Sequence, residues 1–337
     1  MPNERVQATY VFPQGFGWGV ALKAPADRAP DFSPSWLETL PYRDWVIVLD
    51  WARLMPEPTR EDEAQWAALE SWLRALMPRP LWLVLADPDH LPPWWNDIPE
   101  FGRAREAARW AARVAERLHP YASRWVTWLR VPVHDVPPNP PRPRQKPAPR
   151  WEQHQAMVQA LRAVTRGQPI GVGLWADAPL PRPRGAPVQR RVPPTLAEFF
   201  LLQPAAPLTP DEIYHLMRGF ALWDTEFWLF DPGPKAGLQA ADLARRVYQI
   251  WRAVNFNIPA LGYFAWPWSP SYALSPTDVA LYRETEDGFQ ATPAGAWLAS
   301  TARDNAIKPQ DVATYAAEAW SDLYPAEGLD ALRARSA

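Results

Sequence analysis

The chain reads WVIVLD at residues 45–50, EDEAQWAALESWLRALM at 61–77 and LWLVLAD at 81–87. The first and third stretches are unbroken apolar runs of strand length, each ending in an aspartate, as expected of strands buried on both faces. In the middle stretch, Trp66 and Leu69 begin a series of apolar residues spaced three and four positions apart, which is typical of one helix face. A strand, a covering helix and a further strand form the repeating unit of a parallel sheet.

The same alternation continues along most of the chain. Apolar runs of strand length occupy residues 16–21, 45–50, 81–87, 125–130, 170–177, 226–231 and 261–268. Helical periodicity occupies residues 61–77, 103–118, 151–166, 210–222 and 238–254. We predict a shortened (β/α)8 TIM barrel over residues 1–305, irregular between strands five and seven, followed by a C-terminal helical extension over 306–337. The sixth strand has one candidate, the apolar run at 196–202.

Composition excludes several classes of protein. The 337 residues include no cysteine, which removes disulfides, thiolate catalysis and cysteine-held metals, and the five histidines show no metal-binding spacing. No Gly-x-Gly-x-x-Gly or P-loop motif follows the first strand, so a doubly wound nucleotide-binding sheet is not supported. We expect no cofactor. The net charge of −2, with no signal peptide and no apolar run of membrane length, favours a cytoplasmic protein without nucleic-acid binding or membrane insertion.

Two segments are rich in proline and arginine. Residues 132–150 contain eight prolines and residues 179–194 contain six, so both are expected to be extended, and so much proline is typical of a thermophile. In a barrel they follow strands four and five at the C-terminal face. Merely solvated loops are one interpretation. The other is a basic face for an acidic protein partner, with the candidates Arg142, Arg144, Lys146, Arg150, Arg182, Arg184, Arg190 and Arg191.

Five short motifs point to a known family. The chain carries FPQGFGWGVA at 12–21, DWARLMP at 50–56, PLWLVL at 80–85, WVTW at 125–128 and LGYFAW at 261–266. In this order they resemble the motifs around strands one, two, three, four and eight of the family 1 glycoside hydrolases, the β-glucosidase type of (β/α)8 barrel. The resemblance covers most of the chain. It implies retaining hydrolysis by two carboxylates about 5 Å apart, one a nucleophile and the other a proton donor.

The chain departs from that family at both catalytic positions. Where the family has its proton donor, in T-F-N-E-P, this chain has Arg130, and a guanidinium keeps its proton at any working pH. Where the family has its nucleophile, in I-T-E-N-G, this chain has Asp231, whose side chain is one methylene shorter. We therefore expect a degenerate barrel without catalysis, in which Arg130 and Asp231 form an ion pair across the mouth.

Three functions remain open at this point. The leading hypothesis is a non-catalytic, glycosidase-like barrel that acts as a binding or scaffold subunit through its basic face. The second is a hydrolase in which Asp231 works with another strand-end acid, although such aspartates more often cap helices. The third is a carbohydrate-binding protein that stacks sugars on strand-end tryptophans. The ligand-cleft candidates are Trp51, Arg53, Asp87, Asp177, Trp266 and Trp268.

Overall fold

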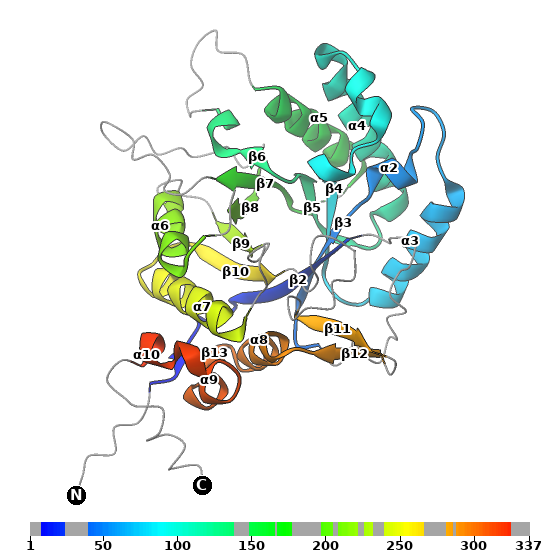
Figure 1. Ribbon diagram of the computed structural model, residues 1–337. Helices are drawn as coiled ribbons and strands as arrows, with labels where there is room; N and C mark the ends of the chain where they lie inside the picture. Colours follow the sequence, from blue (N-terminus) through cyan, green and yellow to red (C-terminus); the bar gives the residue numbers. More distant parts are fainter. Residues whose placement is uncertain are drawn as a thin grey trace, which may run out of the picture.

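The computed structural model describes residues 8–23, 40–137, 148–165, 167–176, 197–204, 208–221, 226–231, 239–265, 281–285 and 288–324 (Figure 1). Eight strands in this part form a closed barrel in which every neighbouring pair is parallel. They are β2 (Gly17–Lys23), β3 (Asp44–Val48), β4 (Leu81–Ala86), β5 (Ala122–Trp128), β7 (Ile170–Ala176), β8 (Phe199–Pro204), β9 (Phe227–Asp231) and β10 (Ala260–Ala265).

Two pairings close the ring. Strand β10 pairs with β2, with Gly262 opposite Gly17, and β5 pairs with β7, with Trp125 opposite Ile170. The short strand β6 (Val131–Pro132) adds to the C-terminal part of β7. The predicted (β/α)8 barrel is confirmed, and the doubtful sixth strand exists as β8.

Helices surround the barrel in the described part of the chain (Figure 1). The long ones are α3 (Glu63–Leu76), α4 (Glu100–Leu118), α5 (Pro149–Val164), α6 (Pro210–Phe220), α7 (Ala240–Asn255) and α8 (Pro293–Asp304). Their starts follow local sequence signals: Asp62 accepts hydrogen bonds from two amides in the first turn of α3, and Thr209 with Glu212 forms a capping box at α6. Short elements carry the chain out of the barrel strands, namely α2 (Trp51–Leu54), η1 (Pro88–His90), η2 (Pro93–Asp97) and η3 (Val133–Asp135).

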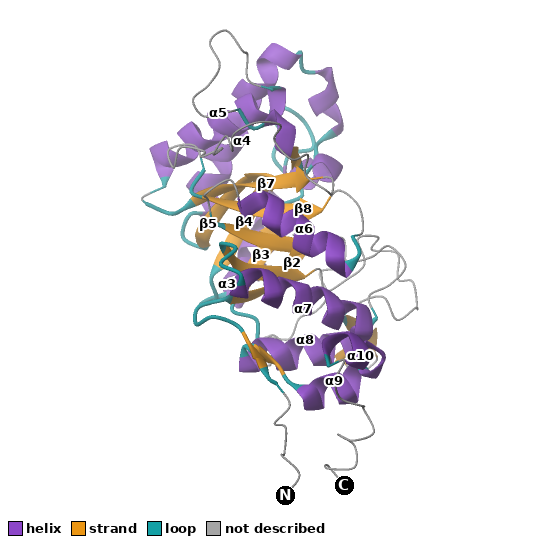
Figure 2. Cartoon of the chain, turned by 90° about the vertical axis from the view of Figure 1, so that its left-hand side faces the viewer, coloured by secondary structure: helices purple, strands orange, loops and turns teal. Residues whose placement is uncertain are grey.

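The two ends of the described chain meet beside α7 (Figure 2). Strand β1 (Tyr10–Val11) pairs with β13 (Ala306–Ile307), and the Tyr10 hydroxyl donates a hydrogen bond of 2.5 Å to the Leu323 carbonyl. The hairpin of β11 (Tyr282–Thr285) and β12 (Gly288–Ala291) precedes α8, and α9 (Pro309–Tyr315), η5 (Ala317–Ala319) and α10 (Trp320–Leu323) follow β13. The division of the chain at residue 305 stays a prediction.

Large aromatic rings fill the barrel interior. The ring of Trp82 contacts those of Phe199, Trp228 and Phe264 at centroid distances of 4.8–5.0 Å. Glycines on neighbouring strands make room for them, since a Cβ at Gly262 would clash with the Trp228 ring. Much of the unusual tryptophan content therefore serves to pack the fold.

Candidate functional site

Asp231, the acid expected at the mouth of the barrel, lies on the outer side of its strand. The inward side chains of β9 are Trp228 and Phe230, which pack in the barrel interior, and Asp231 follows on the opposite face. Its carboxylate meets Arg246 of α7, with Nη1 at 3.0 Å from Oδ2 and 3.2 Å from Oδ1. The ion pair is sealed, because the Arg246 and Asp231 side chains are 5% and 2% exposed.

Two further contacts hold this pair between the barrel and α7. The Tyr263 hydroxyl of β10 donates to Asp231 Oδ2 over 3.2 Å, and Arg246 Nη2 donates to the Leu208 carbonyl over 2.5 Å. Burial, together with the Asp231 charge, raises the pKa of Tyr263 well above its usual value, so this phenol stays a donor. The Asp231–Arg246 pair therefore ties two strands and α7 to the segment that leads into α6.

Arg130 lies at the end of β5 and pairs with acids from the neighbouring strand end. Its guanidinium bonds to Asp87, with Nε at 3.1 Å from Oδ1, and its Nη2 is 2.6 Å from Asp89 Oδ2. Burial by itself lowers the pKa of Arg130, but the two carboxylates outweigh it and raise that pKa. The expected ion pair between Arg130 and Asp231 is wrong, because Asp231 turns toward the helices while Arg130 stays at the mouth.

The backbone at Arg130 is also unusual. Its φ of 57° places it in the left-handed region, which side chains other than glycine rarely adopt. Arg150 of α5 donates a hydrogen bond of 2.8 Å from Nη1 to the Arg130 carbonyl. Burial lowers the pKa of Arg150, while nearby Asp135 opposes the shift. Arg150, predicted as a partner-binding cation, is half-buried and supports the turn that carries Arg130.

The other described cleft candidates, Trp51 and Arg53, lie just after the end of β3. Asp50 caps α2 by accepting a hydrogen bond of 3.1 Å from the Arg53 amide, and Arg53 Nε lies 3.5 Å from Asp50 Oδ2. Trp51 is 1% exposed and stacks on Trp110 of α4 with centroids 4.9 Å apart. This placement corrects the expectation that Trp51 lines a ligand cleft, because its ring fills the layer between barrel and helices.

Several predicted residues lie outside the described residues. They are Asp177, Trp266 and Trp268 of the cleft candidates, and Arg142, Arg144, Lys146, Arg182, Arg184, Arg190 and Arg191 of the basic face. Their roles stay predictions.

Two residues at the mouth were not singled out from the sequence as a pair. Trp175 lies opposite Gln203 in the β7–β8 register, and both continue the inward alternation of their strands. Trp175 is 38% exposed, and the buried Oε1 of Gln203 has no hydrogen-bond partner among the described residues. In the described part of the mouth, Trp175 thus offers an open aromatic surface.

Arg246 is a further residue that sequence reasoning missed, although a signal existed. It lies three residues after Leu243 and four before Ile250, both of which are fully buried, so it occupies the apolar face of its helix. An arginine there needs a buried carboxylate. Asp231, at the end of the preceding strand, supplies it.

The described carboxylates at the strand ends are thus already engaged. Asp50 caps a helix, Asp87 holds Arg130, and Asp231 holds Arg246. No group of acids and histidines able to hold a metal occurs in the part of the chain that the structure describes. Retaining hydrolysis needs two free carboxylates about 5 Å apart, and the described mouth does not present such a pair.

Comparisons with known proteins agree with this architecture. No protein-family model and no curated protein sequence matches the chain. Among solved structures, a β-glycosidase from Pyrococcus horikoshii is similar at 13% identity and a TM-score of 0.63, over 92% of this chain and 99% of that one. A β-glucosidase from Thermotoga maritima in complex with deoxynojirimycin is similar at 13% identity and a TM-score of 0.64, over 89% and 100%.

No described helix is both long and apolar enough to cross a bilayer. At the identities above, the similarity to solved structures supports the fold only. Any chemistry has to be inferred from the residues of this chain. The chain has the (β/α)8 barrel architecture seen in family 1 β-glucosidases.

Proposed function

We propose that the chain is a glycosidase-like barrel that does not hydrolyse glycosides and acts as a binding or scaffold subunit. The observation that carries this proposal is the orientation of Asp231. Its carboxylate faces α7 and is neutralised by Arg246, while Phe230 takes the inward position beside it. A nucleophile must reach the sugar at the mouth of the barrel, and a carboxylate buried behind the strand does not.

The opposite side of the mouth supports the same proposal. Arg130 stands where a proton donor would be needed, and a guanidinium does not give up its proton at working pH. Asp87, the acid nearest to it, is 6% exposed and is held by that guanidinium. An inverting enzyme built from Asp231 and Asp87 would need both carboxylates in an open cleft with a water between them, and neither is open.

The binding role is inferred from the charge distribution of the sequence. Between residues 132 and 195, ten lysines and arginines stand against three acids, while the whole chain has a net charge of −2. These segments follow strands β5 and β7, so they start at the same end of the barrel. A basic surface built from proline-rich, preordered segments suits an acidic protein partner, and we assign that partner class to it.

The catalytic half of the proposal is tested by hydrolysis assays. Purified protein is incubated with aryl β-glucosides and β-galactosides from acidic to neutral pH, and the released phenol is measured. We expect release at the rate of buffer alone. Turnover that disappears in Asp231→Asn, while the circular dichroism spectrum of that variant stays native, would contradict the proposal.

The binding half is tested with polyglutamate as the acidic probe. We expect binding that weakens as salt rises, and a several-fold loss of affinity in Arg142→Gln/Arg144→Gln. The matched control is Arg60→Gln/Arg218→Gln, which removes the same charge from exposed positions outside the two segments. Equal losses in the two double variants would mean that binding follows net charge alone, which contradicts a dedicated basic face.

A further inference from the structure

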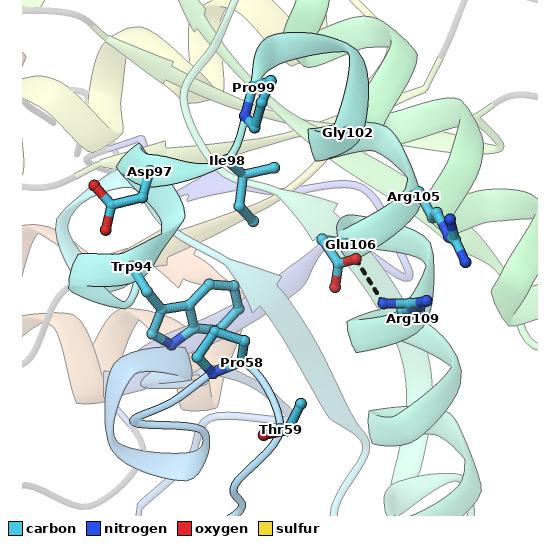
Figure 3. A pocket seen from close by; sticks show the side chains of 10 residues that line it. All are labelled: Pro58, Thr59, Trp94, Asp97, Ile98, Pro99, Gly102, Arg105, Glu106 and Arg109. Carbon is cyan, nitrogen blue, oxygen red and sulfur yellow. Dashed lines mark hydrogen bonds and ion pairs between the residues drawn. The ribbon is translucent and has the colours of Figure 1, made fainter.

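A surface groove lies on the outer side of the barrel, among the elements that follow strands β3 and β4. It has a volume of about 460 Å³ and runs between the segment before α3, the short helix η2 and the first turns of α4 (Figure 3). Pro58, Trp94 and Ile98 give it an apolar lining. Trp94 is fixed there, because its indole donates a hydrogen bond of 3.1 Å to the Met55 carbonyl and its ring packs edge-on against Trp51. The lining is therefore formed in the free chain and needs little ordering to bind.

Opposite charges flank this groove, and two of them are unpaired. Arg109 and Glu106 neutralise each other, with Nη1 at 2.7 Å from Oε1. Asp97 and Arg105 are exposed and have no ion pair or side-chain hydrogen bond within the described ranges. They lie on opposite sides of the groove, with Ile98 between them (Figure 3). The surface thus offers one free negative and one free positive charge across an apolar strip.

A prominent apolar side chain stands beside the groove. Phe101 is 90% exposed, the largest exposed fraction among the large apolar residues of the described chain. It lies one helical turn before Arg105 on α4, so the two side chains share a face. Phe101 and the apolar groove lining together form an exposed apolar surface rimmed by charged residues, and patches of this kind mark association sites.

We propose that this surface is the contact between two copies of the chain, related by a two-fold axis. In such a contact the same patch serves both partners, so each residue contact occurs twice. Phe101 of each copy enters the other's groove against Pro58, Trp94 and Ile98. Asp97 of each copy meets Arg105 of the other.

The charges favour a second copy over another occupant. A partner of one sign would satisfy Asp97 or Arg105 and leave its opposite buried without a counter-ion, which is costly. A second copy in two-fold orientation supplies both counter-charges at once. The contact uses neither Arg130, nor Asp231, nor the two basic segments, so it stands independently of the proposed function.

The test is sedimentation equilibrium of the full chain and of charge-reversed variants. We expect the wild type to dimerise reversibly, and Asp97→Arg and Arg105→Asp each to raise the dimer dissociation constant at least about tenfold. When the two variants are mixed, the arginine introduced in one meets the aspartate introduced in the other, and the second charge pair of the contact keeps its native residues. The mixture should therefore form a heterodimer of wild-type affinity. Phe101→Ser should also weaken the dimer, whereas Phe256→Ser, which alters a residue that is 67% exposed at the end of α7, should not.

Three results would overturn this proposal. The first is a wild type that sediments as a monomer over the whole concentration range, or that dimerises with no loss in Asp97→Arg or Arg105→Asp. The second is a mixture of the two charge-reversed variants that stays as monomers while each variant retains the native circular dichroism spectrum. The third is an equal weakening by Phe256→Ser and Phe101→Ser, which would place the contact elsewhere or make it unspecific.

Discussion

The ends of strands β5 and β9 carry the two positions that correspond, by sequence resemblance, to the catalytic acids of family 1 glycosidases. Both hold a charged residue in an ion pair, yet the two pairs differ in their surroundings. At β9, Asp231 and Arg246 are 2% and 5% exposed behind the strand. At β5, the side chains of Arg130 and Asp87 are 22% and 6% exposed at the mouth, and that of Asp89 is 65% exposed.

The difference shows that the face of a strand decides what a charged residue at its end can do. Successive side chains of a strand point to opposite faces, so one position separates the barrel interior from the helix layer. Phe230 takes the inward face and Asp231 the outward one. Asp231 therefore acts as a structural anchor, while the Arg130 pair remains within reach of solvent.

The largest effect is expected from breaking the buried pair. Asp231→Ala should lower the free energy of unfolding by about 3–5 kcal/mol, because it leaves the Arg246 guanidinium buried without a counter-charge. Urea unfolding followed by circular dichroism measures the change.

The matched control replaces both partners with apolar residues of similar size. Asp231→Leu/Arg246→Met should recover most of the loss, since no unpaired charge remains and a buried ion pair contributes little net stability. If the double variant lost as much unfolding free energy as the two single variants added together, the two residues would contribute independently and not as an ion pair.

A smaller loss of stability is expected from substitutions at the mouth. Arg130→Ala should cost about 1–3 kcal/mol, because Asp87 loses the cation that holds it. Arg130→Gly should cost about 1 kcal/mol less than Arg130→Ala, because glycine adopts the φ of 57° without strain. Chemical denaturation of the three proteins in parallel gives both differences. Identical stabilities of the Ala and Gly variants would mean that the backbone stores no strain there.

The effect of salt on stability should differ between the two regions. Raising the salt concentration to about 1 M should shrink the stability loss caused by Arg130→Ala, since charges near solvent are screened. The loss caused by Asp231→Ala should stay the same, because the Arg246 pair is sealed from solvent. Equal responses of the two variants would contradict the difference in burial between the regions.

The smallest effect concerns a third acid, at the other end of the barrel. Asp44 of β3 is 7% exposed and accepts a hydrogen bond of 3.2 Å from the Trp82 indole. Burial raises its pKa, even though Arg43 and Arg124 and the indole pull it down. Because the folded chain holds this proton more tightly than the unfolded chain, stability is lost as pH rises from the unfolded to the folded pKa.

Asp44→Asn should therefore be slightly more stable than the wild type at about pH 7, and the gain should vanish at about pH 3, below the usual aspartate pKa of about 3.9. Thermal melting of the two proteins at both pH values measures this. A variant that is less stable at neutral pH would show that the Asp44 charge is needed there.

The barrel could be predicted from the sequence because strands and covering helices differ in period. Strand β4, and β3 after its first residue Asp44, read as unbroken apolar runs, and α3 and α4 show one apolar face each. Even the weak run at 196–202 led to β8, which begins three residues later.

The orientation of Asp231 could not be predicted in the same way. Residues 227–231 are buried on both faces of the strand, so no alternation of apolar and polar residues tells which side chains point inward. The motif resemblance set Asp231 at the mouth, whereas the pleat of β9 sets it behind the strand. Arg130 was placed correctly at the end of β5, but its partners, Asp87 and Asp89, lie in the loop after β4, on a different strand.

The most direct test of the account measures glycoside hydrolysis by the wild type beside Asp231→Leu/Arg246→Met. The double variant removes the carboxylate while it avoids an unpaired buried charge, so loss of fold is separated from loss of chemistry. The account predicts that both proteins fold and that both release phenol from aryl β-glycosides at the buffer rate. Turnover by the wild type that is lost in a double variant with an unchanged melting temperature would contradict it.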